Sequence, residues 1–160
     1  MNIKTLIPTS LKYFLREKPF LSDKFYLKQT FKKKMGYPLN LKNPLTFNEK
    51  LQWLKLNDRK DIYTKMVDKF EAKKYVANVL GDDFIIPTLG VYKNFDEIDF
   101  SSLPNEFVLK TTHDSGGVCI CRNKNDFDYN EAKNKITKSL KKKYYWHGRE
   151  WSYKNVVQRI

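Results

Sequence analysis

The chain has 160 residues, of which 41% are hydrophobic and 15% aromatic, so it can build a packed domain and part of a second one, and wholesale disorder is excluded. Its 31 Lys and Arg residues outnumber its 18 Asp and Glu residues, which gives a formal net charge of +13. That balance favours an anionic partner, such as a nucleotide, a nucleic acid, an acidic glycan or an anionic membrane surface. A lysine-rich solvated surface is the alternative.

The sequence also limits the cellular setting. It has no run close to the roughly 20 apolar residues that a membrane span needs. The apolar pair at residues 6–7 is too short for a signal-peptide core, and Pro8 interrupts it. Cys119 and Cys121 are the only cysteines; their spacing on a strand disfavours a mutual disulfide, and one C-x-C pattern does not make a zinc site. We therefore expect a reduced, cytoplasmic chain.

Residues 11–35 are rich in lysine and have the apolar spacing of two helices. Asp23 is expected to cap the second helix and Gly36 to end it. The lysines at 32–34 lie near that end, where cations suit the helix dipole, and contact with an acidic lipid or polymer is the alternative. The apolar stripe of the first helix is Leu11, Phe14 and Leu15.

Two further helices are predicted before residue 81. Thr46 and Glu49 have the spacing of a capping box, so a helix begins there, and its apolar positions predict that it docks on a core. The next helix begins at Asp61 or Asp68 and ends at Gly81. The apolar stripes are Phe47, Leu51, Trp53 and Leu54 in the first of these helices, and Ala72, Tyr75, Val76 and Val79 in the second.

Beyond residue 81 the pattern changes to strands and one helix. Residues 84–86 predict a short strand, which Pro87 restricts to a sheet edge, and residues 91–92 continue it. Residues 130–143 predict a helix and residues 153–160 a last strand. The fold class is therefore α+β, with helices first and then a small antiparallel sheet with flanking helices. The buried side of the last helix is expected to be Ala132, Ile136 and Leu140.

Residues 107–121, reading FVLKTTHDSGGVCIC, form the most informative segment. Two alternating strands surround a polar turn at 113–117, which predicts a hairpin. The paired glycines at the end of this turn let backbone N–H groups approach an anion, and Lys110 adds a point charge. The segment therefore suggests a nucleotide-phosphate site, with a plain hairpin turn as the alternative; it is neither a Walker A nor a Rossmann pattern. One face of the first strand would hold Phe107, Leu109 and Thr111, and the other face Val108, Lys110 and Thr112.

Four segments occur in order along the chain: NPLTFNEKLQWLKLNDRK at 43–60, YTKMVDKFEAKKYV at 63–76, the hairpin at 107–121, and GREWSYKNV at 148–156. Together they resemble the TupA-like ATP-grasp family, in register over residues 37–160. Proteins of this family are often named polysaccharide-biosynthesis proteins or glycosyltransferases. The resemblance implies a helical, basic N-terminal region at 1–45 and a partial ATP-grasp domain at 46–160.

The resemblance also implies roles for individual residues. Lys69, which follows Asp68 at a helix start, and Lys110 would face the phosphates of ATP. Arg149 and Lys154 would contact phosphate or an acidic substrate. Each residue also has a purely structural alternative. Lys69 would be an exposed helix lysine, the polar side chains of the loop would hydrogen bond the turn, and Arg149 and Lys154 would be solvated surface charges. The flap over the β- and γ-phosphates would consist of His113, Asp114, Ser115, Gly116 and Gly117.

The implied cofactors are ATP and, in a full-length relative, Mg. In ATP-grasp ligases the adenine-binding hinge and the metal-binding acids follow the flap region. This chain ends before an obvious version of either, so we assign no metal ligand and expect the chain to stop within a larger domain. The nearby acids Asp126, Asp128 and Glu131 are explained by capping of a helix start.

The implied function is that of an incomplete carboxylate–amine ligase-like protein of bacterial cell-surface polysaccharide biosynthesis, of the teichuronopeptide or capsule type. Its partners would be a nucleotide and an acidic saccharide or amino-acid substrate; peripheral membrane contact stays open and nucleic acid is disfavoured. One alternative is a glycosyltransferase that uses the Asp126-Phe127-Asp128 pattern as its metal site. Another is a non-catalytic basic module for acidic glycan or nucleic acid, based on the cations and aromatic residues at 138–146.

Overall fold

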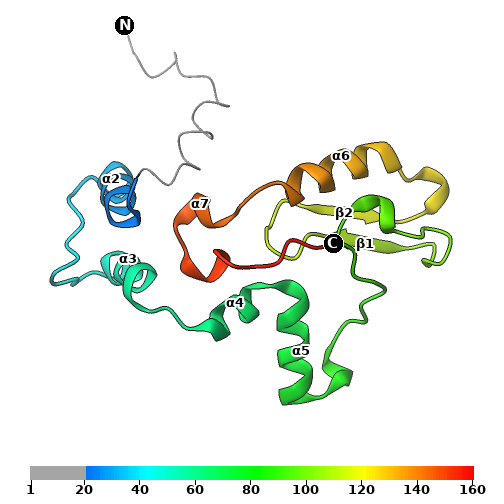
Figure 1. The fold of residues 1–160 in the computed structure, drawn as a ribbon, viewed down its shortest axis with the longest axis horizontal. Helices are drawn as coiled ribbons and strands as arrows, with labels where there is room; N and C mark the ends of the chain where they lie inside the picture. Colours follow the sequence, from blue (N-terminus) through cyan, green and yellow to red (C-terminus); the bar gives the residue numbers. More distant parts are fainter. Residues whose placement is uncertain (1–20) are drawn as a thin grey trace, which may run out of the picture. The chain divides into compact units, whose positions relative to one another are not determined.

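The computed structural model describes residues 21–160 (Figure 1). They fall into two compact units. The first unit takes the chain up to Lys60 together with Tyr145–Trp151, and the second unit takes Asp61–Tyr144 and Ser152–Ile160. The helix expected around Leu11 lies outside the described residues. No helix within residues 21–160 has both the length and the apolar character that crossing a membrane requires.

Helix α2 (Asp23–Met35) opens the described part of the first unit. Its cap is Ser22, whose side chain accepts a hydrogen bond from the Phe25 amide at 3.3 Å, so the expected cap at Asp23 is one residue off. The predicted end at Gly36 is confirmed. Gly36 has a φ of 81°, a left-handed conformation that glycine adopts at little cost, and its amide donates to the Lys32 carbonyl.

Helix α3 (Phe47–Asn57) begins with the predicted capping box. The Thr46 side chain accepts a hydrogen bond from the Glu49 amide at 3.3 Å, and a Glu49 carboxylate oxygen accepts one from the Thr46 amide at 3.0 Å. The same carboxylate accepts hydrogen bonds from the amides of Asn40 and Leu45, so Glu49 ties the preceding loop to the helix. These hydrogen bonds lower the pKa of Glu49, and the one from the Thr46 amide has the largest effect. Desolvation acts in the opposite direction but is outweighed.

The predicted docking stripe of α3 is wrong. Phe47 is 74% exposed, and Leu51, Trp53 and Leu54 are also exposed. Glu49 is the buried residue of this helix, and its carboxylate is used by the capping box and the preceding loop. The core of the first unit is Leu27, Phe31 and Leu39, with the Tyr37 ring packed edge-on against Phe31. Helix α3 does pack against this core, as predicted, but through Leu56 and not through the predicted stripe.

In the second unit, α4 (Asp61–Val67) and α5 (Lys69–Leu80) are separate helices, and both expected starting points are used. Asp68 divides them because its side chain accepts hydrogen bonds from the amides of Phe70 and Glu71, at 2.9 and 3.2 Å, and so caps α5. The buried stripe expected on α5 is wrong, because no residue of α5 is buried and Tyr75 and Val79 are exposed.

The predicted hairpin is confirmed. Strands β1 (Phe107–Lys110) and β2 (Val118–Cys121) pair antiparallel, with Phe107 opposite Cys121 and Lys110 opposite Val118. Helix α6 (Tyr129–Leu140) lies beside β2, and its predicted buried side is confirmed at Ala132 and Ile136, with Leu140 packed against the same core (Figure 1). The α+β class with a small antiparallel sheet is therefore confirmed. The core of this unit is Phe95, Ile98, Leu103, Phe107, Leu109, Cys119, Cys121, Ala132, Ile136 and Ile160.

The other predicted strands are wrong. Phe84 is the last residue of a 3₁₀ turn, and the amides of Phe84 and Ile85 donate to the carbonyls of Gly81 and Asp82, so these two amides are used locally. Residues 153–160 form no strand either. Tyr92 and Ile160 exchange two backbone hydrogen bonds, of 3.1 and 2.8 Å, which is a single pair and not a ladder. The remaining short helices are η2 (Asp82–Phe84), η3 (Phe95–Glu97), η4 (Lys124–Asp126), α7 (Tyr145–Gly148) and η5 (Trp151–Tyr153).

Candidate functional site

A cavity of about 310 Å³ in the second unit is lined by both lysines that the sequence singled out. Lys69 reaches it from the first turn of α5 and Lys110 from the end of β1, and Lys73 is the third cation of the lining. Much of the remaining lining is apolar, which suits a site that holds a flat apolar group next to an anion. It consists of Phe70, residues 86–92, Leu103, residues 107–109, Thr112 and Ile160.

Lys69 is held at the base of the loop that joins the two strands. Its amide donates to the Thr112 carbonyl at 3.0 Å, and its ammonium group donates to the carbonyls of Thr111, at 3.0 Å, and Asp114. Burial lowers the pKa of Lys69; the Asp114 charge opposes this change and the Lys110 charge adds to it. Both side chains line the same cavity, where two positive charges can act on one multiply charged anion.

Lys110 lies on the outward face of β1. The predicted alternation is confirmed there: Phe107 and Leu109 are buried and Val108 and Lys110 are exposed. The side chain is thus attached to a paired strand, and its ammonium group remains accessible to a ligand. This accessibility separates Lys110 from Lys69, which is already hydrogen bonded to the loop.

The base of the loop is a buried polar cluster centred on Asp114. Its carboxylate accepts hydrogen bonds from Thr111 Oγ1 at 2.5 Å, from Ser139 Oγ at 2.6 Å and from the Gly117 amide at 2.9 Å. Burial raises the pKa of Asp114, but the hydrogen bonds from Ser139 and Thr111 reverse the effect, so the pKa is lowered overall. The carboxylate is therefore an anchor that fastens the loop to α6.

His113 is buried beside this cluster, and its Nε2 lies 3.2 Å from the Ser139 carbonyl oxygen. Its Nδ1 has no hydrogen-bond partner among the described residues. Burial lowers the pKa of His113, with the Asp114 carboxylate opposing and the Lys69 charge adding to the change. His113 and Asp114 thus hydrogen bond the loop to the protein, while their expected role at the phosphates stays a prediction.

The exposed tip of the loop consists of Ser115 and Gly116. Gly117 is buried, and a Cβ there would lie closer than 3.0 Å to Thr111 Oγ1 and to the Ser139 side chain. The two glycines therefore have different tasks: Gly117 allows the loop to close onto the Asp114 cluster, and Gly116 leaves the tip unobstructed.

Arg149 and Lys154 are not among the residues that line the cavity. Arg149 belongs to the first unit and is 1% exposed, which excludes solvated surface charge at this position. Its Nη1 lies 3.1 Å from Asp23 Oδ1, and its guanidinium group lies 4.3 Å from the centroid of the Trp146 ring. Lys154 is exposed and belongs to the second unit. Their contact with a substrate stays a prediction.

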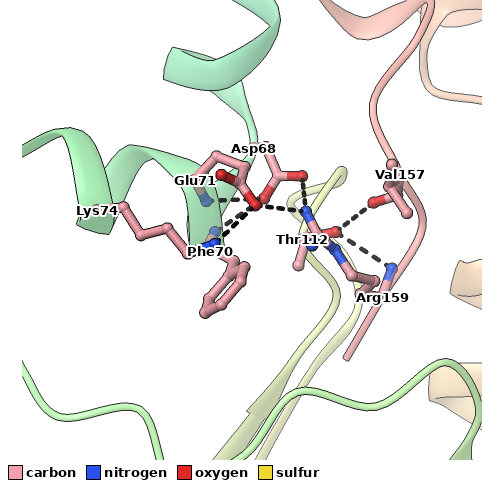
Figure 2. A network of polar contacts seen from close by, with 7 residues as sticks. All are labelled: Asp68, Phe70, Glu71, Lys74, Thr112, Val157 and Arg159. Atoms are coloured by element: carbon pink, nitrogen blue, oxygen red, sulfur yellow. Dashed lines mark hydrogen bonds and ion pairs between the residues drawn. The ribbon is translucent and has the colours of Figure 1, made fainter.

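The sequence missed a polar network that joins α5 to the loop and to the end of the chain (Figure 2). Arg159 donates to Asp68 Oδ2 at 2.7 Å and to Glu71 Oε1 at 3.3 Å, and its backbone pairs with Thr112. A capping acid at Asp68 was visible as a pattern, but nothing local marks Arg159 as its partner 91 residues away. Lys73, which donates to the Ile86 carbonyl at 2.8 Å, was also missed.

The acids near α6 have local tasks. Asp128 caps the helix by accepting a hydrogen bond from the Glu131 amide at 2.8 Å, and Asp126 accepts one from Asn123 Nδ2 at 2.7 Å. Within residues 21–160 no group of three or more His, Cys, Asp or Glu side chains is placed to hold a metal ion. Within residues 21–160, Asp126 and Asp128 are therefore not part of a group of three or more possible metal ligands.

None of residues 113–117 lines the cavity, so the glycine loop is tied to it through Lys69, which donates to the Asp114 carbonyl. An α+β unit with two lysines lining one cavity defines a candidate phosphate-binding protein. The family model described as TupA-like ATPgrasp matches residues 49–160, more than half of the chain, so the chain belongs to this family. A search of curated proteins and a search of solved structures each gave no match.

Proposed function

We propose that the chain binds the phosphates of ATP between Lys69, Lys110 and the loop tip at Ser115 and Gly116. The observation that supports this proposal most strongly is that both lysines line one cavity, although they are 41 positions apart in the sequence. Two ammonium groups can offset much of the charge of a triphosphate, and an exposed glycine lets a phosphate oxygen approach the backbone. The apolar lining from residues 86–92 offers a surface for the flat base.

Membership of the ATP-grasp family supports a more specific activity, that of a carboxylate–amine ligase in cell-surface polysaccharide synthesis. ATP supplies a phosphoryl group to a carboxylate oxygen, and an amine nitrogen then attacks the acyl carbon, releasing phosphate and a proton. In this scheme Lys69 and Lys110 hold and neutralise the triphosphate. Because the described residues hold no metal cluster, we assign no step to a metal.

Calorimetric titration of the 160-residue chain with ATP tests the proposal. Lys110→Ala removes an accessible ammonium group, so we expect affinity to fall by roughly 10- to 100-fold, the equivalent of a lost charged hydrogen bond of about 1.5–3 kcal/mol. Lys69→Met should have an effect of similar size, with circular dichroism used to verify the fold. Unchanged affinity in both variants would falsify the proposal.

The matched control is Lys138→Ala, which removes the same charge from an exposed position of α6 away from the cavity. We expect this variant to bind ATP like the unmodified chain. An equal loss in Lys138→Ala and Lys110→Ala would mean that net charge alone attracts the nucleotide, and it would favour the basic-module alternative.

A further inference from the structure

Thr112 lies two residues after Lys110 and forms backbone hydrogen bonds in two directions. Its carbonyl accepts from the Lys69 amide at 3.0 Å, and its amide donates to the Arg159 carbonyl at 2.9 Å. The Thr112 hydroxyl adds a hydrogen bond to the Val157 carbonyl at 2.8 Å, and the Arg159 amide donates back to that hydroxyl at 3.2 Å. The segment around Arg159 is thus fastened along the base of the loop (Figure 2).

The Arg159 side chain contacts the first turn of α5, the helix that carries Lys69. Its Nη2 donates to Asp68 and Glu71, and its guanidinium group lies 5.1 Å from the centroid of the Phe70 ring. Asp68 is buried and is the residue directly before Lys69. A buried carboxylate that loses its cation is strongly unfavourable, so Arg159 holds the first turn of α5 in place.

We propose that Arg159 is a positioning residue that fixes the spacing between the ammonium groups of Lys69 and Lys110. Its side chain holds Asp68, next to Lys69, and its backbone holds Thr112, next to the strand that carries Lys110. No contact between Arg159 and the nucleotide is required. The inference rests on the proposed function, because the spacing matters only if both lysines bind one anion.

The first test needs no nucleotide. The Lys69 amide stands at the first position of α5, where no helical carbonyl is available, and donates to Thr112 instead. In Arg159→Gln we expect the amides of Lys69 and Thr112 to exchange with deuterium roughly tenfold faster or more, while the Ala132 amide of α6 keeps its protection. If the Lys69 and Thr112 amides exchanged at the same rates in Arg159→Gln as in the unmodified chain, the positioning role would be overturned, whether or not ATP binds.

The second test measures ATP affinity. We expect Arg159→Gln to bind about tenfold more weakly, Arg159→Lys to recover part of the loss because it retains the charge, and the control Arg122→Gln, an exposed change of the same kind, to bind normally. When Lys110 is already replaced by alanine, Arg159→Gln should reduce ATP affinity much less, because only one of the two lysines is then left to bind the phosphates.

The outcomes separate the two proposals. A full additional loss in the Lys110→Ala background would show that Arg159 acts independently of that lysine, and it would overturn the positioning role. If the unmodified chain binds no ATP, the proposed function fails, and the exchange of the Lys69 amide alone decides whether Arg159 fixes α5 against the loop. Should Arg159→Gln not fold, Arg159→Lys takes its place in both measurements.

Discussion

Gly116 and Gly117 are neighbours in one loop, but their surroundings differ. A Cβ on Gly117 would collide with the buried side chains of Thr111 and Ser139, whereas a Cβ on Gly116 would meet nothing closer than 3.7 Å. We therefore expect Gly117→Ala to lower the free energy of unfolding by about 1–3 kcal/mol, the usual scale of overpacking. Gly116→Ala is the matched control and should change it by less than about 0.5 kcal/mol. Urea unfolding measures both, and equal stabilities would contradict the packing argument.

The sequence marks some candidate site residues one by one and others only as a group. Lys69 and Lys110 could be selected because the family motif and the alternation of β1 mark them individually. For residues 113–117 the motif gave one role to the whole loop, whereas the structure shows buried anchors at His113 and Asp114 and an exposed tip. That division depends on Ser139, which approaches from α6 and whose contact with the loop no local pattern encodes.

The loop and α6 are joined through groups that respond to pH. Burial keeps the folded-state pKa of His113 below its ordinary value of about 6.5, so the unfolded chain takes up a proton first as the pH falls. The free energy of unfolding should therefore decrease as the pH falls from about 7.5 to about 5.5. His113→Gln should flatten this decrease, as followed by urea unfolding across that range. The control is His147→Gln, which alters the other histidine of the chain and should leave the His113 contribution intact. An unchanged pH dependence in His113→Gln would remove His113 as its source.

Elements with strong local signals were predicted correctly. The capping box at Thr46, the glycine end of α2 and the β1–β2 hairpin depend on residues close together in the sequence. The strands predicted at 84–86 and 153–160 failed because apolar runs do not say which backbone partner is present. The amides of Phe84 and Ile85 are used in a 3₁₀ turn, and near the end of the chain Ile160 pairs with Tyr92 while Arg159 accepts from Thr112, so no continuous ladder forms. The predicted burial of the apolar stripes of α3 and α5 was wrong for a related reason: amphipathic spacing does not identify the element against which a helix packs.

The two units of the molecule interleave along the chain, which the sequence did not suggest. The chain passes between them at residues 60/61, 144/145 and 151/152, so residues 145–151 return to the first unit. The expected domain boundary at residues 45/46 stays a prediction.

Side chains hold the returning segment, residues 145–151, against α2: Tyr145 donates to Asp23 at 2.5 Å, and Arg149 pairs with the same carboxylate. Burial, and to a smaller extent the hydrogen bond to Asp23, raises the pKa of Tyr145 to about 12. The Tyr145 hydroxyl therefore remains protonated and can donate at neutral pH.

Arg149 and Arg59 both face Asp23, which provides a matched pair for testing how the first unit is held together. Arg149 is buried against the Tyr26 and Trp146 rings, whereas Arg59 is exposed and lies 3.8 Å from Asp23. We expect Arg149→Met to lower the free energy of unfolding by about 2–4 kcal/mol, because the partly buried Asp23 carboxylate loses the nearer of its two cations and the rings lose their cationic partner.

Arg59→Met should cost less than about 1 kcal/mol, as exposed ion pairs do. Hydrogen exchange locates the effect: amides of α2 should lose protection in Arg149→Met, and amides of α6 in the second unit should lose less. If both helices lost protection equally, the two units would unfold together, and the returning segment would stabilise the whole molecule instead of one unit. If Arg59→Met were as destabilising as Arg149→Met, the attraction to Asp23 would outweigh the ring contacts.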